Sequence, residues 1–301
     1  MNQKKRSEKQ QTILEAQGAE KAIEENLFSF IRAVAPVENN EFHEDNRGIW
    51  FNAGFSAPSM LSACVYNFQN QGKEVKVAVA EQLQIFKERK VPVLWTIGPS
   101  SGRALKEALD DSMMHVQTQA GMAIDLSSLS KTNTLPGDVE VVEIQEASQL
   151  LPWFKLYNAC FEQAPALSFL MAERYEKAFL DRELPMRHYI AYLQGRPAAT
   201  ASFYSENKVT GIYNIVTAPE ARGRGIGEFM TRHVLLEGRK RGDTIGILQA
   251  TPAGEPVYRR IGFEQYCTID MYIKLFGSSL VMVPLNLLRV KVSNMMRKIF
   301  S

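Results

Sequence analysis

Apolar and polar residues alternate along the second half of the chain in a regular order of strand-like and helix-like patterns. Period-two alternation and short apolar runs predict strands in residues 139–144, 188–193, 198–204, 208–216, 244–250 and 264–275. Apolar residues at helical spacing predict helices in residues 153–161, 167–180 and 226–241, and a shorter one after Thr251. In that short helix, Thr251 is expected as the N-cap, Pro252 at the first helical position and Gly262 at the end. The alternation predicts an α/β fold.

The first half of the chain has a similar order. Strands are predicted in residues 60–67, 91–97 and, as a pair, 115–126, and helices in residues 74–90 and 99–109. This order matches that of the second half from residue 208 onward, although unrelated α/β domains show the same alternation. Ser, Thr, Pro and Gly are concentrated in residues 127–138, which predicts a linker. It would separate an N-terminal domain, residues 1–126, from a second domain, residues 139–275.

The composition narrows the class of protein. A chain of 301 residues is long enough for two domains. Its 35 basic and 33 acidic residues give a net charge of +2, which offers no argument for a nucleic-acid partner. Three widely spaced cysteines, without a CxxC or Cys/His cluster, argue against a disulfide framework and a metal site. Neither a secretory h-region nor an apolar run of about 18 residues is present, so a cytoplasmic protein is expected.

A glycine-rich basic turn joins the strand at 208–216 to the helix at 226–241. It consists of Arg222, Gly223, Arg224, Gly225, Ile226 and Gly227. A turn of this kind leaves several backbone N–H groups unpaired at the positive end of a helix dipole, which favours phosphate. Glycine permits close approach and positive φ, and the two arginines add full charge. The spacing is neither a Walker loop nor a Rossmann fingerprint, and the simplest alternative is a basic loop without a ligand.

The turn and a second segment together resemble one enzyme family. Residues 222–227 match the Arg/Gln-x-x-Gly-x-Gly/Ala pyrophosphate loop of the GCN5-related N-acetyltransferases, the GNAT superfamily. Downstream, Tyr258, Gly262 and Phe263 match the Tyr-x-x-x-Gly-Phe segment of that family. One position departs from the pattern, because Thr251 stands where the family often has Asn. The first half of the chain has no such loop before its helix at 74–90, so the protein resembles tandem GNAT proteins with a degenerate N-terminal half.

The resemblance implies a fold, a co-substrate and a reaction. The fold is a mixed central sheet flanked by helices, and the co-substrate is acetyl-CoA, with its pyrophosphate on residues 222–227. The pantetheine arm would pair with the backbone of Asn214, Ile215 and Val216 and reach Thr251. Tyr258 would be the general acid that protonates the leaving thiolate. The implied reaction is direct acetyl transfer to a primary amine, on a small molecule or a protein, in a ternary complex.

Several alternatives remain open from the sequence. Tyr258 could be a packed helix aromatic, and Glu206 and Glu255 have the pattern of surface charges, so no general base is identified. Because the strand before the loop has no carboxylate, a non-catalytic acyl-CoA-binding sensor is the rival function. Fatty-acyl or aminoacyl donors are further alternatives to acetyl-CoA.

Other aromatic and histidine positions are interpreted as packing. Trp153, Phe161 and Phe169 are expected in the core rather than in an acceptor pocket, and His233 is expected to be a packed histidine. His188 begins a predicted strand, and the sequence indicates no particular role for it.

The tail, residues 276–301, has four basic residues and no acidic one. Its apolar residues share one helical face: Leu285, Leu288, Val292, Met295, Met296 and Ile299. A basic amphipathic helix of this kind either docks on its own domain or across a dimer, or lies on an anionic membrane surface.

Overall fold

The computed structural model describes residues 18–38, 41–52, 63–130, 134, 137–161, 165–180 and 186–276. The chain forms two compact units. Unit 1 contains residues up to 37 together with 119–268, and unit 2 contains residues 38–118 together with those from 269 onward. The predicted linker, residues 127–138, falls inside the range of unit 1. The units therefore follow spatial contacts rather than order along the chain.

Unit 1 is built on a mixed sheet with the strand order β5-β10-β9-β8-β7-β6. The strands are β5 (Met114–Asp125), β6 (Val139–Glu143), β7 (Met186–Leu193), β8 (Arg196–Glu206), β9 (Val209–Thr217) and β10 (Ile245–Ala250). Neighbouring strands are antiparallel except for β9 and β10, which are parallel. β5 supplies its residues 120–125 to this sheet, although it belongs to the first half of the sequence.

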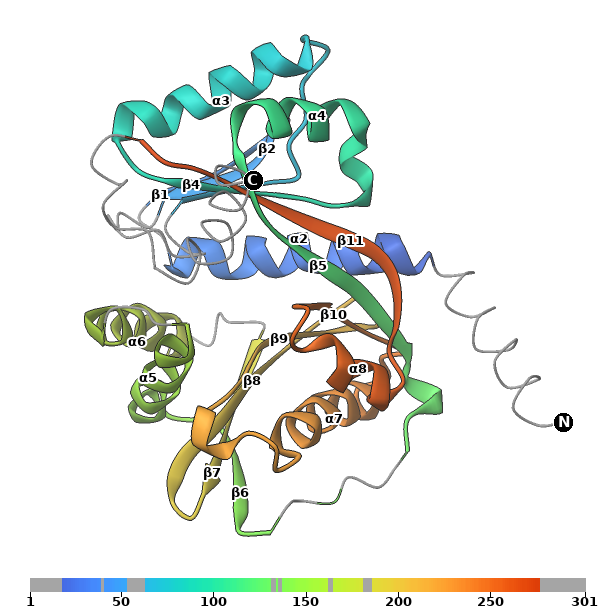
Figure 1. Ribbon diagram of the computed structural model, residues 1–301. Coiled ribbons are helices and arrows are strands. Elements are labelled where there is room, and N and C mark those ends of the chain that lie inside the picture. Colours follow the sequence, from blue (N-terminus) through green and yellow to red (C-terminus); the bar gives the residue numbers. More distant parts are fainter. Residues whose placement is uncertain are drawn as a thin grey trace, which may run out of the picture. The chain divides into compact units, whose positions relative to one another are not determined.

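The helices of unit 1 lie on both faces of its sheet. They are α2 (Ala19–Glu38), α5 (Leu150–Cys160), α6 (Pro165–Leu180), α7 (Ile226–Lys240) and α8 (Glu255–Ile261). His188 of β7 contacts rings of α5 and α6, whereas its neighbour Tyr189 contacts His233 of α7. Because successive side chains of a strand point to opposite faces, α7 covers one face and α5 and α6 the other. Figure 1 shows α7 lying along β8 and β9.

Helix α2 packs on β9, on the face opposite α7. Asn26 donates its Nδ2–H to the carbonyl of Val209 at 3.1 Å and accepts from the Tyr213 hydroxyl at 2.8 Å. A side chain at Gly211 would collide with Asn26, so only glycine allows this close packing. The segment that begins the described chain is therefore an integral part of unit 1.

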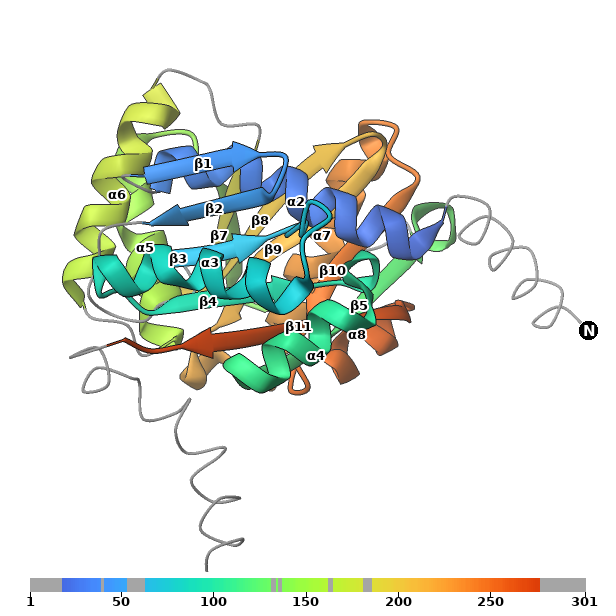
Figure 2. The ribbon, with the colours of Figure 1, turned by 90° about the horizontal axis from the view of Figure 1, so that it is seen from above.

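Unit 2 has the strand order β1-β2-β3-β4-β11. Its strands are β1 (Glu41–Asp45), β2 (Gly48–Asn52), β3 (Ala63–Tyr66), β4 (Val93–Ile97) and residues 269–274 of β11 (Glu264–Lys274). Helices α3 (Val75–Arg89) and α4 (Gly102–Ser112) cover one face, as Figure 2 shows. The core between them is apolar and aromatic, with Trp95 and Phe86 fully buried.

A polar cluster fixes β11 in unit 2. Asp270 accepts hydrogen bonds from Lys106 of α4 at 2.7 Å and from Thr118, and its other contact is His115 Nε2 at 3.1 Å. Burial opposes ionisation of Asp270, but these hydrogen bonds outweigh it and lower the pKa of the carboxyl group. The second half of the chain thus supplies the strand that borders β4.

The structure confirms most predicted elements and corrects several. The α/β fold with a mixed sheet flanked by helices is confirmed. The expected strand pair at 115–126 is wrong, because β5 is one continuous strand. The β1–β2 hairpin was not predicted, since its short polar first strand lacks an alternating pattern. The tail predictions lie outside the described residues, apart from Phe276. Within the described ranges, none of the helices combines the length and apolarity that a membrane span requires.

Candidate active site

Strands β9 and β10 pair only over their first residues and then diverge. The ladder joins Val209 to Ile245 and ends at Gly211 and Ile247. β9 continues to Thr217 with β8 as its partner, and β10 continues beside β5. The facing edges of β9 and β10 beyond Gly211 therefore carry backbone groups that an extended ligand can pair with.

A β-bulge interrupts β9 within this open stretch. Thr200 of β8 is opposite Val216, and Ser202 is opposite Tyr213, so Asn214 and Ile215 together face one residue of β8. Asn214 has a φ of 55°, in the left-handed region. An extra residue of this kind changes the direction of the following amides. The predicted pantetheine contacts, Asn214, Ile215 and Val216, therefore lie at the bulge, where the backbone amides of β9 change direction.

The predicted phosphate loop follows β9 directly. Gly223 and Gly225 have φ values of 76° and 77°, which supports the prediction that glycine is needed for conformation. Gly225 is the N-cap of α7 and provides no side chain for the first-turn amides. These amides therefore remain available to an external acceptor. Arg222, Gly223, Arg224 and Gly225 are exposed, whereas Ile226 is buried in the core.

The charges around the loop are arranged in favour of an anion. Arg222 is fixed by a 3.2 Å hydrogen bond from its Nε to the carbonyl of Thr217. The acid in the first turn of α7, Glu228, is paired with Arg232 at 3.3 Å and lies 4.0 Å from Arg260 of α8. Because these arginines balance Glu228, the helix N-terminus keeps its positive potential.

Tyr258 lies on α8, next to α7 (Figure 1). Its ring packs edge-on against Phe263 with centroids 6.0 Å apart, and Gly254 lies against the ring. Burial raises the pKa of Tyr258 to about 12, so the phenol keeps its proton at neutral pH. Among the described residues, no hydrogen-bond partner of its hydroxyl is found. A protonated donor without an internal partner suits transfer to a ligand.

The start of the Tyr258 helix differs from the prediction. Thr251 and Pro252 were expected at the N-cap and first position, but α8 begins at Glu255 with Pro256 in its first turn. The Thr251 hydroxyl instead accepts the Gly254 N–H at 3.2 Å in the preceding turn. A proline fits either position, so the sequence alone did not separate them. The predicted end at Gly262 is confirmed, with a φ of 112°.

The predictions for the other candidate side chains are confirmed for some and wrong for others. Glu255 is paired with Arg259 at 2.6 Å, and Glu206 is exposed, as expected for surface charges. Trp153 is buried and donates to the carbonyl of Tyr189, which confirms core packing. Phe161 and Phe169 are 38% and 56% exposed, so the prediction of core packing is wrong for them.

Two further expectations concern His233 and metals. His233 packs against the rings of Tyr189 and Phe229, and burial lowers its pKa, which confirms a packed histidine. In the part of the chain that the structure describes, no group of three or more potential metal ligands is found.

Sequence reasoning missed a buried polar chain behind the bulge. His188 contacts Ser202 at 2.8 Å between Nδ1 and Oγ, and Ser202 accepts from the Asn214 amide at 3.1 Å. The predicted hairpin at 188–204 already placed His188 near Ser202. The bulge that turns Asn214 toward them could not be predicted.

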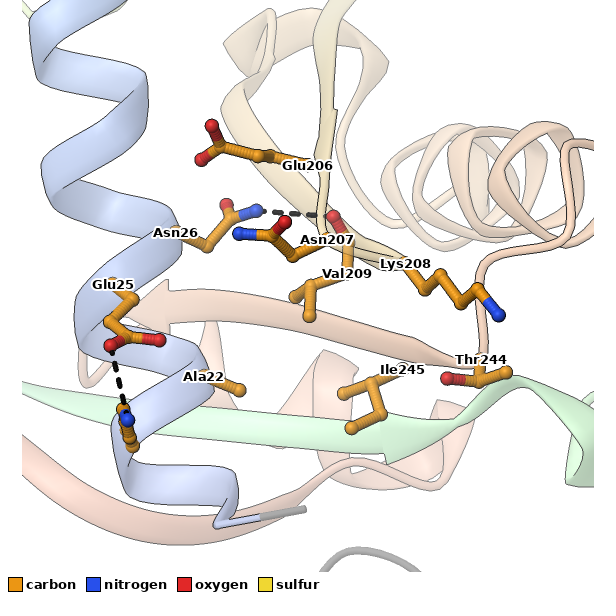
Figure 3. A pocket seen from close by; sticks show the side chains of 10 residues that line it. Ala22, Glu25, Asn26, Glu206, Asn207, Lys208, Val209, Thr244 and Ile245 are labelled. Carbon is orange, nitrogen blue, oxygen red and sulfur yellow. Dashed lines mark hydrogen bonds and ion pairs between the residues drawn. The ribbon is translucent and has the colours of Figure 1, made fainter.

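A pocket of about 340 Å³ opens at the other end of β9 (Figure 3). It is lined by Lys21, Ala22, Glu25, Asn26, Glu206, Asn207, Lys208, Val209, Thr244 and Ile245. It adjoins the paired beginnings of β9 and β10, whereas the phosphate loop follows the end of β9. This pocket is therefore distinct from the predicted cofactor site.

Comparisons with known proteins agree with the geometry. The acetyltransferase (GNAT) family model matches residues 150–263, which include the bulge, the loop and Tyr258. No curated protein shows significant similarity to the sequence.

Solved structures share the fold at low sequence identity. A GCN5-related N-acetyltransferase from Kribbella flavida is 17% identical with a TM-score of 0.58, covering 82% of this chain and 96% of its own. One from Sphaerobacter thermophilus is 17% identical with a TM-score of 0.55, covering 71% and 72%. A tandem GNAT protein from the clavulanic acid biosynthesis pathway is 17% identical with a TM-score of 0.54, covering 76% and 78%. Residues 150–263 are therefore similar to the GNAT family of acetyltransferases, and the chain shares its fold with solved GNAT proteins.

Proposed function

We propose that the protein is an N-acetyltransferase that transfers the acetyl group of acetyl-CoA to a primary amine in a ternary complex. The observation that carries the proposal is the divergence of β9 and β10, with a bulge at Asn214 and an uncapped helix N-terminus directly beyond it. An extended arm that ends in a pyrophosphate needs both features in this order. The strand edge pairs with amide groups of the arm, and the helix N-terminus takes the negative charge.

The loop and the strand bind different parts of acetyl-CoA. The amides of residues 223–227 and the charges of Arg222 and Arg224 hold the pyrophosphate. The backbone of Asn214, Ile215 and Val216 pairs with the pantetheine arm. The Thr251 hydroxyl is exposed beside the start of α8 and is a further contact for the arm.

The chemistry requires stabilisation of one oxyanion and one leaving group. The neutral amine nitrogen bonds to the thioester carbon and gives one proton to water, and the carbonyl oxygen becomes an oxyanion near the Val216 N–H. When the C–S bond breaks, the thiolate takes the phenolic proton of Tyr258, and solvent returns a proton to Tyr258. The raised pKa of Tyr258 keeps this proton in place until a strong base, the thiolate, is formed beside it.

The acceptor must reach the site as a neutral amine. For a lysine with a pKa near 10.4, deprotonation at pH 7 costs about 4.6 kcal/mol, whereas an α-amine near 7.8 costs about 1 kcal/mol. β9 carries no carboxylate, and Glu255 is occupied by Arg259. An amine of low pKa that loses its proton to water is therefore the acceptor class that this site favours.

The same lack of a carboxylate favours one alternative, a non-catalytic sensor that binds acyl-CoA. Steady release of CoA thiol from acetyl-CoA, measured with a panel of amines, peptides and aminoglycosides, distinguishes the two functions. Turnover with at least one amine supports the enzyme. Micromolar binding of acetyl-CoA without turnover for any amine supports the sensor.

The N-terminal half is proposed to be a degenerate GNAT copy without a phosphate site. The turn before α3 contains Gly72 with a φ of 75°, but the helix is capped by Glu74, whose carboxylate accepts the Val77 N–H at 2.9 Å. A carboxylate at this place occupies the amides and repels phosphate. One molecule of acetyl-CoA per chain is therefore expected in a calorimetric titration, and a second one would contradict this assignment.

A further inference from the structure

The conformation of Asn214 needs an explanation. A residue other than glycine loses about 1 kcal/mol or more in the left-handed region, and Asn is among the residues that tolerate it best. The two neighbours of Asn214 in β9 have ordinary side-chain environments, with Tyr213 against α2 and Ile215 against the apolar core. The strained conformation must therefore be held by contacts of Asn214 itself.

Asn214 is held at both its backbone and its side chain. The Thr200 hydroxyl donates to the carbonyl of Asn214 at 2.7 Å. The Asn214 amide donates from Nδ2 to Ser202 Oγ at 3.1 Å. Thr200 and Ser202 are fully buried on β8, so their hydroxyl groups do not contact water, while Asn214 is half-buried.

His188 completes this chain from β7. A hydroxyl has one hydrogen to donate. Ser202 Oγ accepts from Asn214 and has a second lone pair, so it pairs with His188 Nδ1, 2.8 Å away, in either tautomer of the imidazole: it donates its hydrogen to a bare Nδ1 or accepts from an Nδ1–H. Burial lowers the pKa of His188 to about 3, so the ring stays neutral.

Aromatic rings hold the imidazole in place. The rings of Trp153 and Tyr175 meet it nearly edge-on, with centroids 4.8 Å and 5.6 Å away. Its Nε2 has no hydrogen-bond partner among the described residues. A buried polar atom without a partner costs stability, so the aromatic packing must offset this cost and hold the ring against Ser202.

We propose that His188 is a positioning residue, which acts through Ser202 to hold Asn214 in the bulge that aims the β9 amides at the acyl group. This inference rests on the proposed function, because it assigns the thioester to that edge of β9. This side-chain network connects the rings of α5 and α6, through β7 and β8, to β9, so packing far from the ligand sets the direction of the oxyanion donor. Loss of the network moves the donor but leaves the phosphate loop unchanged.

Paired variants separate positioning from simple stability. His188→Asn keeps a polar group that can donate to or accept from Ser202, whereas His188→Leu removes it. Asn214→Gly adopts positive φ freely, whereas Asn214→Ala does not. Complete removal of an oxyanion donor costs about 10² in kcat, so a displaced donor is expected to lower kcat about tenfold in His188→Leu and Asn214→Ala. His188→Asn is expected to keep kcat within about threefold of the parent, and Asn214→Gly is expected to lose less kcat than Asn214→Ala.

Two readouts complete the test. The dissociation constant of acetyl-CoA is expected to change less than about threefold in the two His188 variants, because they leave the phosphate loop unchanged. The carbonyl stretch of bound ¹³C-acetyl-CoA is expected to shift toward its value in water only in His188→Leu and Asn214→Ala. Equal kcat and equal carbonyl frequency within each pair would overturn the proposal.

The network can also be tested without turnover. Backbone chemical shifts of Asn214 in protein labelled with ¹⁵N and ¹³C report whether it leaves the left-handed region in Ser202→Ala. The parent protein is expected to show left-handed shifts and the variant extended ones. Unchanged shifts in Ser202→Ala would overturn the proposal even if the parent protein is active. A parent protein that binds no acetyl-CoA would instead contradict the proposed function, and the chemical shifts would still decide the role of the network.

Discussion

The ring of Phe30 stacks on the ring of Tyr213, with centroids 3.8 Å apart and planes only 6° from parallel. The two residues are far apart in the sequence, yet both belong to unit 1. Tyr213 immediately precedes the bulge residue Asn214, and its hydroxyl is bound by Asn26 of the same helix as Phe30. Helix α2 therefore supports the strand that carries the proposed oxyanion donor.

Replacement of Phe30 by alanine is expected to destabilise unit 1. Removal of a buried phenyl ring from a packed site costs about 3 kcal/mol or more in the free energy of unfolding. The matched control is Phe169→Ala on α6, where the ring is 56% exposed and the expected loss is under about 1 kcal/mol. Urea unfolding followed by circular dichroism measures both. Equal losses in the two variants would show that the stacking on Tyr213 adds nothing.

A fragment containing only residues 139–275 is expected not to fold cooperatively. It lacks α2, and it lacks residues 120–125 of β5, which pair with β10. The edge of β10 and the α2 face of Tyr213 would both be exposed. The measurement is amide-proton dispersion and thermal unfolding of the fragment beside the full chain. A cooperative transition with native-like dispersion in the fragment would contradict this role of the first half.

Gly223→Glu is expected to abolish acetyl-CoA binding while the fold survives. The new side chain would place a carboxylate among the amides that hold pyrophosphate. Gly195→Glu is a matched control, because φ is 75° at Gly195 and 76° at Gly223 and both face open space. Isothermal calorimetry is expected to show parental affinity for Gly195→Glu and at least about a hundredfold loss for Gly223→Glu, a difference of about 2.7 kcal/mol. Gly225→Glu and Gly227→Glu are expected to behave like Gly223→Glu.

Tyr258→Phe is expected to lower kcat by about 10² while the affinity for acetyl-CoA changes little. The phenyl ring keeps the contact with Phe263 and removes only the proton donor. Tyr266→Phe on β11 removes a hydroxyl that donates to Glu264 at 3.3 Å, and this variant is the control. The loss in Tyr258→Phe should shrink with a thioester of a more acidic thiol, which needs less protonation. Parental turnover in Tyr258→Phe would mean that water protonates the thiolate.

His188 makes the stability of the protein depend on pH in the acid range. Its pKa is about 3 in the folded state and near 6.5 when unfolded, so below pH 6.5 the unfolded state binds the extra proton. Stability is expected to fall as the pH drops from 6.5 toward 3, by about 2 kcal/mol between pH 7 and pH 5 from this residue. In His188→Asn this contribution is absent, so urea midpoints of the variant should change less over that range. Parallel pH profiles would show that His188 is accessible to protons in the folded protein.

The sequence by itself determined the features that depend on local spacing. Residues 222–227 indicated a phosphate loop because glycines that need positive φ stood before an amphipathic helix, and the structure gives Gly223 and Gly225 that conformation. The helices α3, α6 and α7 and most strands also followed from apolar periodicity. The resemblance to the GNAT family identified Tyr258 through the Tyr-x-x-x-Gly-Phe motif. The catalytic role of Tyr258 stays a prediction.

Only the tertiary structure decided which segments complete each unit. No local pattern shows that residues 120–125 pair with β10, that β11 borders β4, or that α2 packs on β9. Strand pairing and helix packing depend on surfaces that meet after the chain has folded back over many residues. The same holds for His188, Ser202 and Asn214, which come together because a single extra residue in β9 turns one side chain to the other face of the sheet.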